Sequence, residues 1–156
     1  MATGKTTIAR LLVDELRCPL IDCDEALAAR TGHTAVEIAE RDGVDALHDL
    51  EAAVLLDALA HTEPCIVTAA ASTIEYDVCL AALRAEFVVW LRADVAALAA
   101  RARHQSHRPL DDDIETQLRA QSARRDPLFA AVADVTIDVT DTTPEAAARL
   151  ILSANG

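Results

Sequence analysis

The chain has 156 residues and a formal net charge of −12 at pH 7, and 52% of its residues are hydrophobic but only 3% aromatic. This length suits a single domain with its own core. The negative charge argues against nucleic acid and membrane surfaces as partners, because both favour basic patches, whereas a small anionic ligand needs only local positive charge.

Apolar residues at helical spacing alternate along the chain with short apolar runs typical of buried strands. Helices are predicted directly after Lys5, from the capping box Thr34–Glu37 onward, and over residues 24–29, 43–60, 74–84, 94–103, 114–133 and 145–153. Strands are predicted over residues 19–22, 65–68, 87–91 and 135–139. We expect Asp24 to cap the helix that it begins, and Pro127 to kink or break its helix.

This alternation predicts an α/β protein in which helices cover both faces of a parallel sheet. No repeat or linker divides the sequence, so one domain is expected over residues 1–156. Ligands of such sheets bind beyond the carboxyl ends of the strands. The places that fall there are the loop before Gly4, the turn 22–24, the turn 69–71 and the segment after Val139.

The cysteines form no Cys-x-x-Cys pair and are expected to be reduced, mostly buried thiols in a cytoplasmic protein. Zinc binding is not indicated. The longest uncharged run, residues 64–74, is too short to span a bilayer. We therefore expect neither a membrane nor a nucleic-acid partner.

Gly4-Lys5-Thr6 is the closing half of a phosphate-binding loop of the form G-x-x-x-x-G-K-[ST]. A helix N-terminus presents free N–H groups to phosphate, Lys5 would reach the β- and γ-phosphates, and the Thr6 hydroxyl would bind Mg²⁺. Three residues can match by chance, but the helix that follows and the strand–helix alternation favour a nucleotide site.

Asp22 and Asp24 stand two residues apart at the end of a predicted strand. One carboxylate could hold Mg²⁺ through water, and the other could accept a proton from an attacking hydroxyl. On this pattern alone, capping of the next helix is the simpler interpretation of Asp24.

Four arginines, Arg101, Arg108, Arg124 and Arg125, could stabilise phosphate or bind an anionic substrate, because a guanidinium matches oxyanions in a bidentate way. Charges on a solvated helix face are the usual alternative. Arg108 differs because it lies in the polar segment 104–113, which is predicted to be a loop that could close over the phosphates as a lid.

Together these residues resemble the shikimate kinases, which are P-loop kinases of a small molecule. The resemblance covers almost the whole chain and runs through Gly4-Lys5-Thr6-Thr7, Leu20-Ile21-Asp22-Cys23-Asp24, Arg30-Thr31-Gly32, Asp42-Gly43, Leu50-Glu51, Arg108-Pro109-Leu110, Arg125-Asp126-Pro127-Leu128-Phe129 and Pro144. It implies a three-layer αβα fold with a five-stranded parallel sheet. It also implies transfer of the γ-phosphoryl group of ATP, with Mg²⁺, to a hydroxyl of a small acidic metabolite, as from shikimate to shikimate 3-phosphate.

The resemblance also implies roles for individual residues. It implies that the nucleotide is bound by Gly4, Lys5, Thr6, Thr7, Arg101 and Pro144, with Arg101 and Pro144 against the adenine. It implies that the metal is bound by Thr6 and Asp22, and that the catalytic residues are Asp24, Lys5 and Arg108. The substrate-binding residues that it implies are Asp24, His48, Ala69, Ala70, Ala71 and Arg125. We expect a monomer.

The sequence departs from the family at three places. His48 stands where the family has a second substrate-binding arginine, and Ala69-Ala70-Ala71 stands where it has three glycines, so we expect a narrower pocket and a more restricted turn. The opening glycine of the phosphate loop and the strand before it are absent. We therefore expect that the first, central strand is missing from this chain and that the natural protein begins upstream of Met1. A non-catalytic relative that binds nucleotide or metabolite, or a kinase for a different acidic alcohol, is the alternative.

Overall fold

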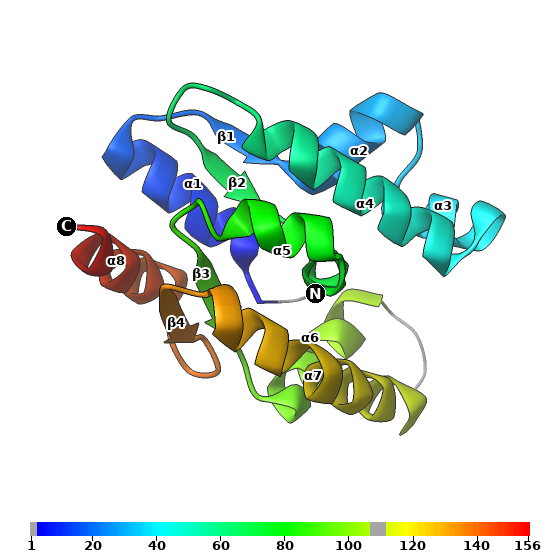
Figure 1. Ribbon diagram of the computed structural model, residues 1–156. Coiled ribbons are helices and arrows are strands. Elements are labelled where there is room, and N and C mark those ends of the chain that lie inside the picture. Colours follow the sequence, from blue (N-terminus) through cyan, green and yellow to red (C-terminus); the bar gives the residue numbers. More distant parts are fainter. Residues whose placement is uncertain (1–2, 107–111) are drawn as a thin grey trace. The chain divides into compact units, whose positions relative to one another are not determined.

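The computed structural model of the protein describes residues 3–106 and 112–156, with the side chains of residues 102–106, 112 and 113 excepted (Figure 1). The chain forms two compact units. The terminal unit comprises residues 1–8 and 87–156, and the middle unit comprises residues 9–86. The first turn of helix α1 (Lys5–Leu16) belongs to the terminal unit, and the rest of this helix belongs to the middle unit.

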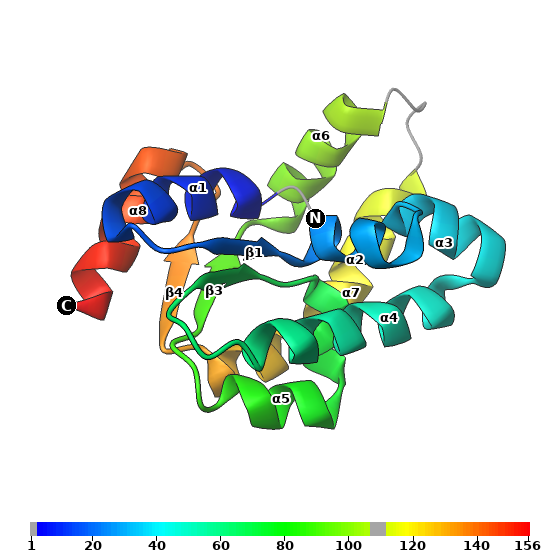
Figure 2. The ribbon, with the colours of Figure 1, turned by 90° about the horizontal axis from the view of Figure 1, so that it is seen from above.

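In the middle unit, β1 (Leu20–Asp22) pairs with β2 (Ile66–Thr68) in parallel, with Asp22 opposite Thr68 (Figure 2). The helices of this unit are α2 (Cys23–Thr31), α3 (Ala35–Asp42), α4 (Val44–Leu59), the 3₁₀ turn η1 (Ala71–Glu75) and α5 (Asp77–Leu83). Because the strands are parallel and in register, the turns after β1 and β2 leave the sheet at the same edge.

The core of the middle unit lies among α2, α3, α4 and α5. Its largest fully buried side chains in this cluster are Leu27, Ile38, Leu55 and Cys79. The predicted capping box is confirmed, because the Thr34 hydroxyl accepts from the Glu37 N–H at 3.3 Å and the Glu37 carboxylate accepts from the Thr34 N–H at 2.7 Å. These two bonds satisfy N–H groups that the first turn of α3 would otherwise leave open.

Two helix ends in this unit use left-handed backbone. Gly32, with φ +74°, ends α2, and Arg17, with φ +53°, follows α1. A Cβ on Gly32 would meet no atom within 4 Å, so the cost of a side chain there is purely conformational. We expect Gly32→Ala to lower the free energy of unfolding by about 1 kcal/mol and Arg17→Gly to raise it by a few tenths to about 1 kcal/mol. Urea unfolding measures the change in the free energy of unfolding for both variants. Changes of the same sign would contradict the assignment of left-handed backbone to both positions.

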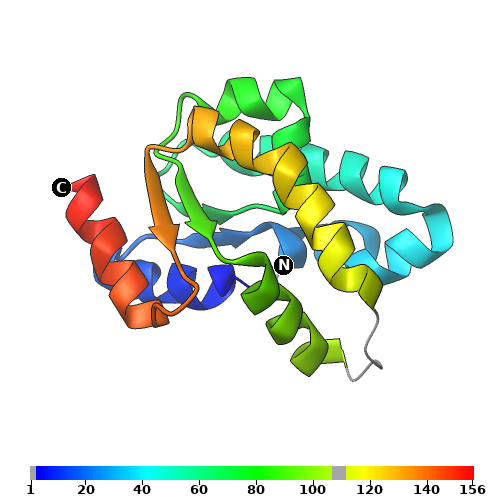
Figure 3. The same cartoon turned by 90° about the horizontal axis from the view of Figure 1, so that it is seen from below.

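In the terminal unit, β3 (Val89–Arg92) pairs with β4 (Val135–Asp138), again in parallel (Figure 3). The helices are α6 (Val95–Ser106), α7 (Asp112–Val132) and α8 (Pro144–Asn155). The rings of Trp90 on β3 and Phe129 on α7 stack at 5.4 Å between centroids, which packs α7 against the sheet of this unit. Pro144 starts α8, as predicted, with Thr143 as its N-cap.

Most predicted elements are confirmed, and the differences have local causes. Asp22, not Asp24, caps α2, because its carboxylate accepts from the Asp24 N–H. The helix predicted over 74–84 is two pieces, since Tyr76 is extended between η1 and α5. Helix α6 extends to Ser106, and α7 continues through Pro127 without a break.

The strand predicted from Phe87 begins instead at Val89. The N–H of Val88 donates to the carboxylate of Asp134 at 2.8 Å, and its carbonyl accepts from the N–H groups of Asp134 and Val135. A side chain thus replaces the regular strand pairing at this end. The described strands form two two-stranded sheets. In the described ranges, no helix combines the length and the apolar character that crossing a bilayer requires.

Candidate active site

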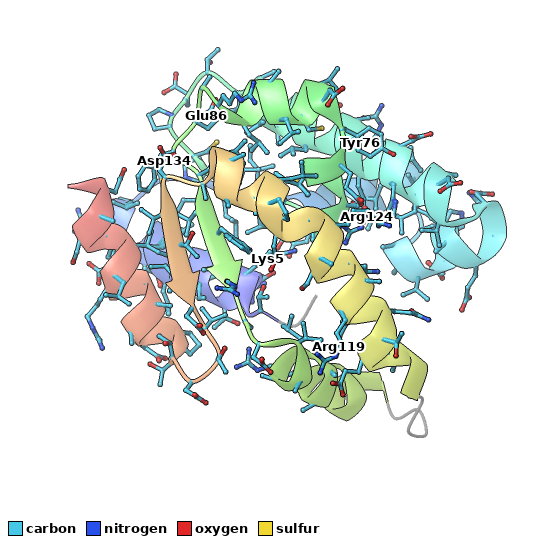
Figure 4. The ribbon with its side chains drawn as sticks, turned by 60° about the horizontal axis from the view of Figure 1, so that its bottom comes forward. Lys5, Tyr76, Glu86, Arg119, Arg124 and Asp134 are labelled. Atoms are coloured by element: carbon cyan, nitrogen blue, oxygen red, sulfur yellow. The ribbon has the colours of Figure 1, made fainter. Side chains whose placement is uncertain are left out.

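The N-terminus of α1 begins directly after a glycine in left-handed conformation. Gly4 has φ +79°, and its carbonyl accepts the first helical bond, from Ile8, at 3.0 Å. Lys5, the only lysine of the chain, is half-buried at the first position of α1 (Figure 4). Its ammonium group makes no bond within the part of the chain that the structure describes. The first turn of α1 therefore offers open N–H groups and an uncommitted cation together.

A pocket of about 230 Å³ opens beside this helix start in the terminal unit. Its lining residues are Thr3, Gly4, Ile8, Arg101, Val139, Thr142 and Pro144. Three of these were predicted from the sequence as nucleotide residues, namely Gly4, Arg101 and Pro144. The sequence did not single out Thr3 and Thr142, since isolated threonines carry no motif.

Arg101 reaches the pocket from α6 and is held by the segment after β4. Its Nη2 donates to the carbonyl of Val139 at 2.8 Å and to that of Thr140 at 2.6 Å. Bonds to two successive carbonyls fix the plane of a guanidinium. Pro144, which also lines the pocket, is fixed by its ring and by the Thr143 cap of α8, whose hydroxyl accepts from the Ala146 N–H at 3.2 Å.

The arginines of α7 differ in burial. Arg125 is only 8% exposed. Arg124, which Figure 4 labels, is exposed. A buried guanidinium is costly unless it is paired, and Arg125 does have partners in the structure. The interpretation as a solvated helix-face charge therefore fits Arg124 and does not fit Arg125. Arg108 and most of the predicted lid segment lie outside the described residues.

In the middle unit, the two aspartates after β1 have separate tasks. Asp22 is 6% exposed, and its Oδ1 accepts from the Asp24 N–H at 3.0 Å as the N-cap of α2. Asp24 is exposed in the first turn of α2, and its carboxylate has no partner among the described residues. The prediction that Asp24 caps this helix is wrong.

The alanine turn 69–71 follows β2 and lies beside the Asp22 turn, because Asp22 and Thr68 are paired in register. Ala70 has φ −68° and ψ 142°. Among the described residues, Arg17 alone of the non-glycine residues has positive φ. The turn thus uses backbone that alanine adopts without strain.

Two buried hydroxyls fix this turn. Thr73 donates to the carbonyl of Ala70 at 2.7 Å, and Ser72 donates to the carboxylate of Glu51 on α4. His48 stands one helical turn before Glu51 on the same face of α4. It is half-buried and has no partner within the described ranges. The structure therefore ties the helix of His48 to the alanine turn through a contact that the sequence did not indicate.

The phenol at the end of η1 adds a neutral donor to this unit. Tyr76 donates to Asp49 on α4 at 2.8 Å, and burial together with this carboxylate raises the pKa of Tyr76 to about 12. Tyr76 therefore stays protonated at neutral pH. It holds the start of α5 against α4 as a structural residue.

The donors predicted for Mg²⁺ are oxygen atoms, the Thr6 hydroxyl and the Asp22 carboxylate, which suit a hard cation. No group of three or more histidine, cysteine, aspartate or glutamate side chains in the described residues could hold a metal ion. Mg²⁺ commonly keeps several waters and takes one or two protein ligands beside phosphate oxygens. Taken singly, each of these two oxygen donors is of a kind that fits Mg²⁺ bound with a nucleotide.

Comparison with known proteins shows the family of the chain. The sequence pattern of the family described as shikimate kinase matches residues 1–155. A shikimate kinase of Halorhodospira halophila is 34% identical over 157 residues, which cover 99% of this chain and 88% of that protein. One of Thermobifida fusca is 34% identical over 149 residues, which cover 95% and 86%.

Solved structures show the same likeness. The shikimate kinase from Acinetobacter baumannii in complex with shikimate has a TM-score of 0.82 and 29% identity, with 98% of this chain and 85% of that chain covered. The fold is thus that of an α/β phosphotransferase with parallel strands. The chain belongs to the shikimate kinase family.

Proposed function

We propose that the protein transfers the γ-phosphoryl group of ATP to shikimate, giving shikimate 3-phosphate. The observation that carries this proposal is the pocket that joins Gly4, at the open N-terminus of α1, to Arg101 and Pro144. Family membership and the shikimate complex of the Acinetobacter baumannii relative support the acceptor.

The nucleotide roles follow from the chemistry of the terminal unit. Open N–H groups at the start of α1 suit phosphate oxygens, and Lys5 adds a cation without a competing partner. Arg101 and Pro144 would flank the adenine, with Thr7 near the phosphates and Arg108 as the lid arginine. Bound Mg²⁺, held by Thr6 and Asp22, would neutralise charge on the transferred phosphoryl group.

The acceptor roles divide among several elements. Asp24 would accept the proton of the attacking hydroxyl, which its uncommitted carboxylate permits. Arg125 would bind the substrate carboxylate, as suits a guanidinium kept out of bulk water. His48 and the alanine turn would line the remaining part of the substrate site.

The location of the protein, its oligomeric state and its partners are also part of the proposal. We place the protein in the cytoplasm as a monomer of one domain, with neither nucleic acid nor a membrane as partner. All four cysteines are free thiols, Cys23 and Cys79 buried, and Cys18 and Cys65 half-buried. The finer architecture that we propose, a three-layer αβα fold, rests on the family resemblance.

The first test is release of ADP from Mg–ATP with and without shikimate. Shikimate-dependent release, at rates on the order of 1–10³ s⁻¹ as usual for enzymes, is the expected result. Binding of ATP without release for shikimate, but with release for another hydroxy acid, would favour a different acidic alcohol as acceptor. Binding of ligands without any turnover would favour a non-catalytic relative.

The alternative acceptor is favoured by His48 and the alanine turn, and this leads to a prediction. Replacement of Ala69, Ala70 and Ala71 by glycine, together with His48→Arg, should raise kcat/KM for shikimate. A charge-assisted bond to a carboxylate contributes about 1.5–3 kcal/mol, so we expect a gain of roughly 10- to 100-fold. Steady-state kinetics with shikimate measure the gain, and no gain would mean that these positions do not limit the reaction.

A further inference from the structure

Thr140, two residues beyond the end of β4, connects three parts of the terminal unit. Its N–H donates to Asp138 Oδ1 at 2.9 Å, and its hydroxyl oxygen accepts from the N–H of Asp94 at 2.9 Å. Its carbonyl oxygen accepts from Nη2 of Arg101 at 2.6 Å. The end of β4, the turn before α6 and α6 itself therefore meet at one residue.

The contact with Asp94 sets the start of α6. Asp94 caps this helix, because its Oδ1 accepts from the N–H groups of Ala96 at 2.8 Å and Ala97 at 3.3 Å. Arg101 follows seven residues later, which is about two helical turns and therefore close to the same face of α6. The position of Asp94 at the start of α6 therefore helps to set the position of the Arg101 guanidinium.

The contact with Asp138 fixes the backbone of Thr140. Interactions with the side chain and the backbone N–H of Thr140 hold the pKa of Asp138 below its usual range. The N–H donates to Oδ1 at 2.9 Å, and such a charge-assisted bond is stronger than a neutral one. The backbone that carries the Thr140 hydroxyl and carbonyl is therefore held at the end of β4.

We infer that Thr140 is a positioning residue for nucleotide binding, whose hydroxyl holds Arg101 on the wall of the pocket shared with Gly4 and Pro144. Thr140 does not line this pocket, so it acts through Arg101. The inference rests on the proposed function, because it takes the nucleotide as the ligand of the pocket. The sequence did not single out Thr140.

The test is Thr140→Val, which removes the hydroxyl and keeps the branched shape. We expect the Kd for Mg–ADP, measured by calorimetry, and the KM for Mg–ATP to rise about fivefold, the factor that corresponds to the loss of one ordinary hydrogen bond. The kcat and the KM for shikimate should stay unchanged, since the lost interaction binds ground state and transition state alike.

Three further variants make this test specific. Thr140→Ser keeps the hydroxyl and should bind Mg–ADP as the wild type does. Thr136→Val makes the same replacement at an exposed threonine of β4 whose side chain has no partner in the described ranges, and it should have no effect. Asp138→Asn weakens the bond that the Thr140 N–H makes to residue 138 and should raise the Kd for Mg–ADP in the same direction.

Wild-type affinity in both Thr140→Val and Asp138→Asn would overturn the inference while leaving the proposed function intact. An equal loss in Thr136→Val would overturn it too, because the effect would then be one of general packing. Fluorescence of Trp90, the only tryptophan, reports whether each variant is folded. If Thr140→Val is unfolded, the Kd of Asp138→Asn for Mg–ADP alone tests the inference. A wild-type protein that binds no nucleotide would contradict the proposed function and this inference with it.

Discussion

Lys5→Ala is expected to lower kcat for phosphoryl transfer by about 10²–10³-fold, the effect typical of removing one group that stabilises charge in the transition state. Lys5 makes no bond within the described residues, so its loss should leave the free energy of unfolding almost unchanged. Steady-state kinetics and urea unfolding of the same preparation measure both quantities.

Arg10→Ala is the matched control for Lys5. Arg10 lies on the same helix and forms an exposed ion pair with Glu25 at 3.7 Å. Exposed pairs of this kind contribute little, so this variant should keep both activity and stability.

Because Lys5 is the only lysine, acetylation of its ammonium group can also be followed by mass spectrometry. Mg–ATP should protect Lys5, and acetylation at an unchanged rate would contradict its role at the phosphates.

Asp24→Asn is expected to lower kcat by about 10²–10⁴-fold, as for the loss of a general base, with the KM values little changed. An amide matches the size of the carboxylate but cannot accept the proton of the acceptor hydroxyl. Since Asp22 caps α2, the variant should keep its stability. The pH profile of kcat, measured with and without the substitution, separates loss of a base from loss of binding.

Glu25→Gln provides the comparison for Asp24. Glu25 is the next carboxylate on α2 and is exposed, and among the residues that the structure describes its partner is Arg10, at 3.7 Å. Its replacement should leave kcat unchanged. A retained kcat in Asp24→Asn, or an equal fall in Glu25→Gln, would show that Asp24 is not the base.

The sequence predicted the elements well where periodicity decides them. Apolar spacing located α1, α4 and α7, and continuous apolar runs located β2 and β3 to within two residues. The capping box was predictable because Thr34 and Glu37 are three residues apart, so the whole interaction is local. Gly4, Arg101 and Pro144 were assigned to the nucleotide through the resemblance, and the structure brings these three to one pocket.

The rest depends on contacts between residues far apart in the chain. Whether Asp22 or Asp24 caps α2 depends on where β1 ends, and this is set by pairing with β2 more than forty residues later. The bond from Ser72 to Glu51 and the bond from Arg101 to Thr140 join residues 21 and 39 positions apart. No local pattern marks such pairs, so the residues that fix the turn 69–71 and orient Arg101 were not foreseen.

The most direct test of the central claim is identification of the product. The protein is incubated with Mg–ATP and shikimate, and phosphorus NMR and mass spectrometry follow the γ-phosphoryl group. The account predicts a phosphate ester of shikimate in equal amount to ADP, and an initial rate of ester formation about 10²–10³-fold lower with Lys5→Ala. Formation of ADP with only inorganic phosphate, or of no ADP while both ligands bind, would contradict it.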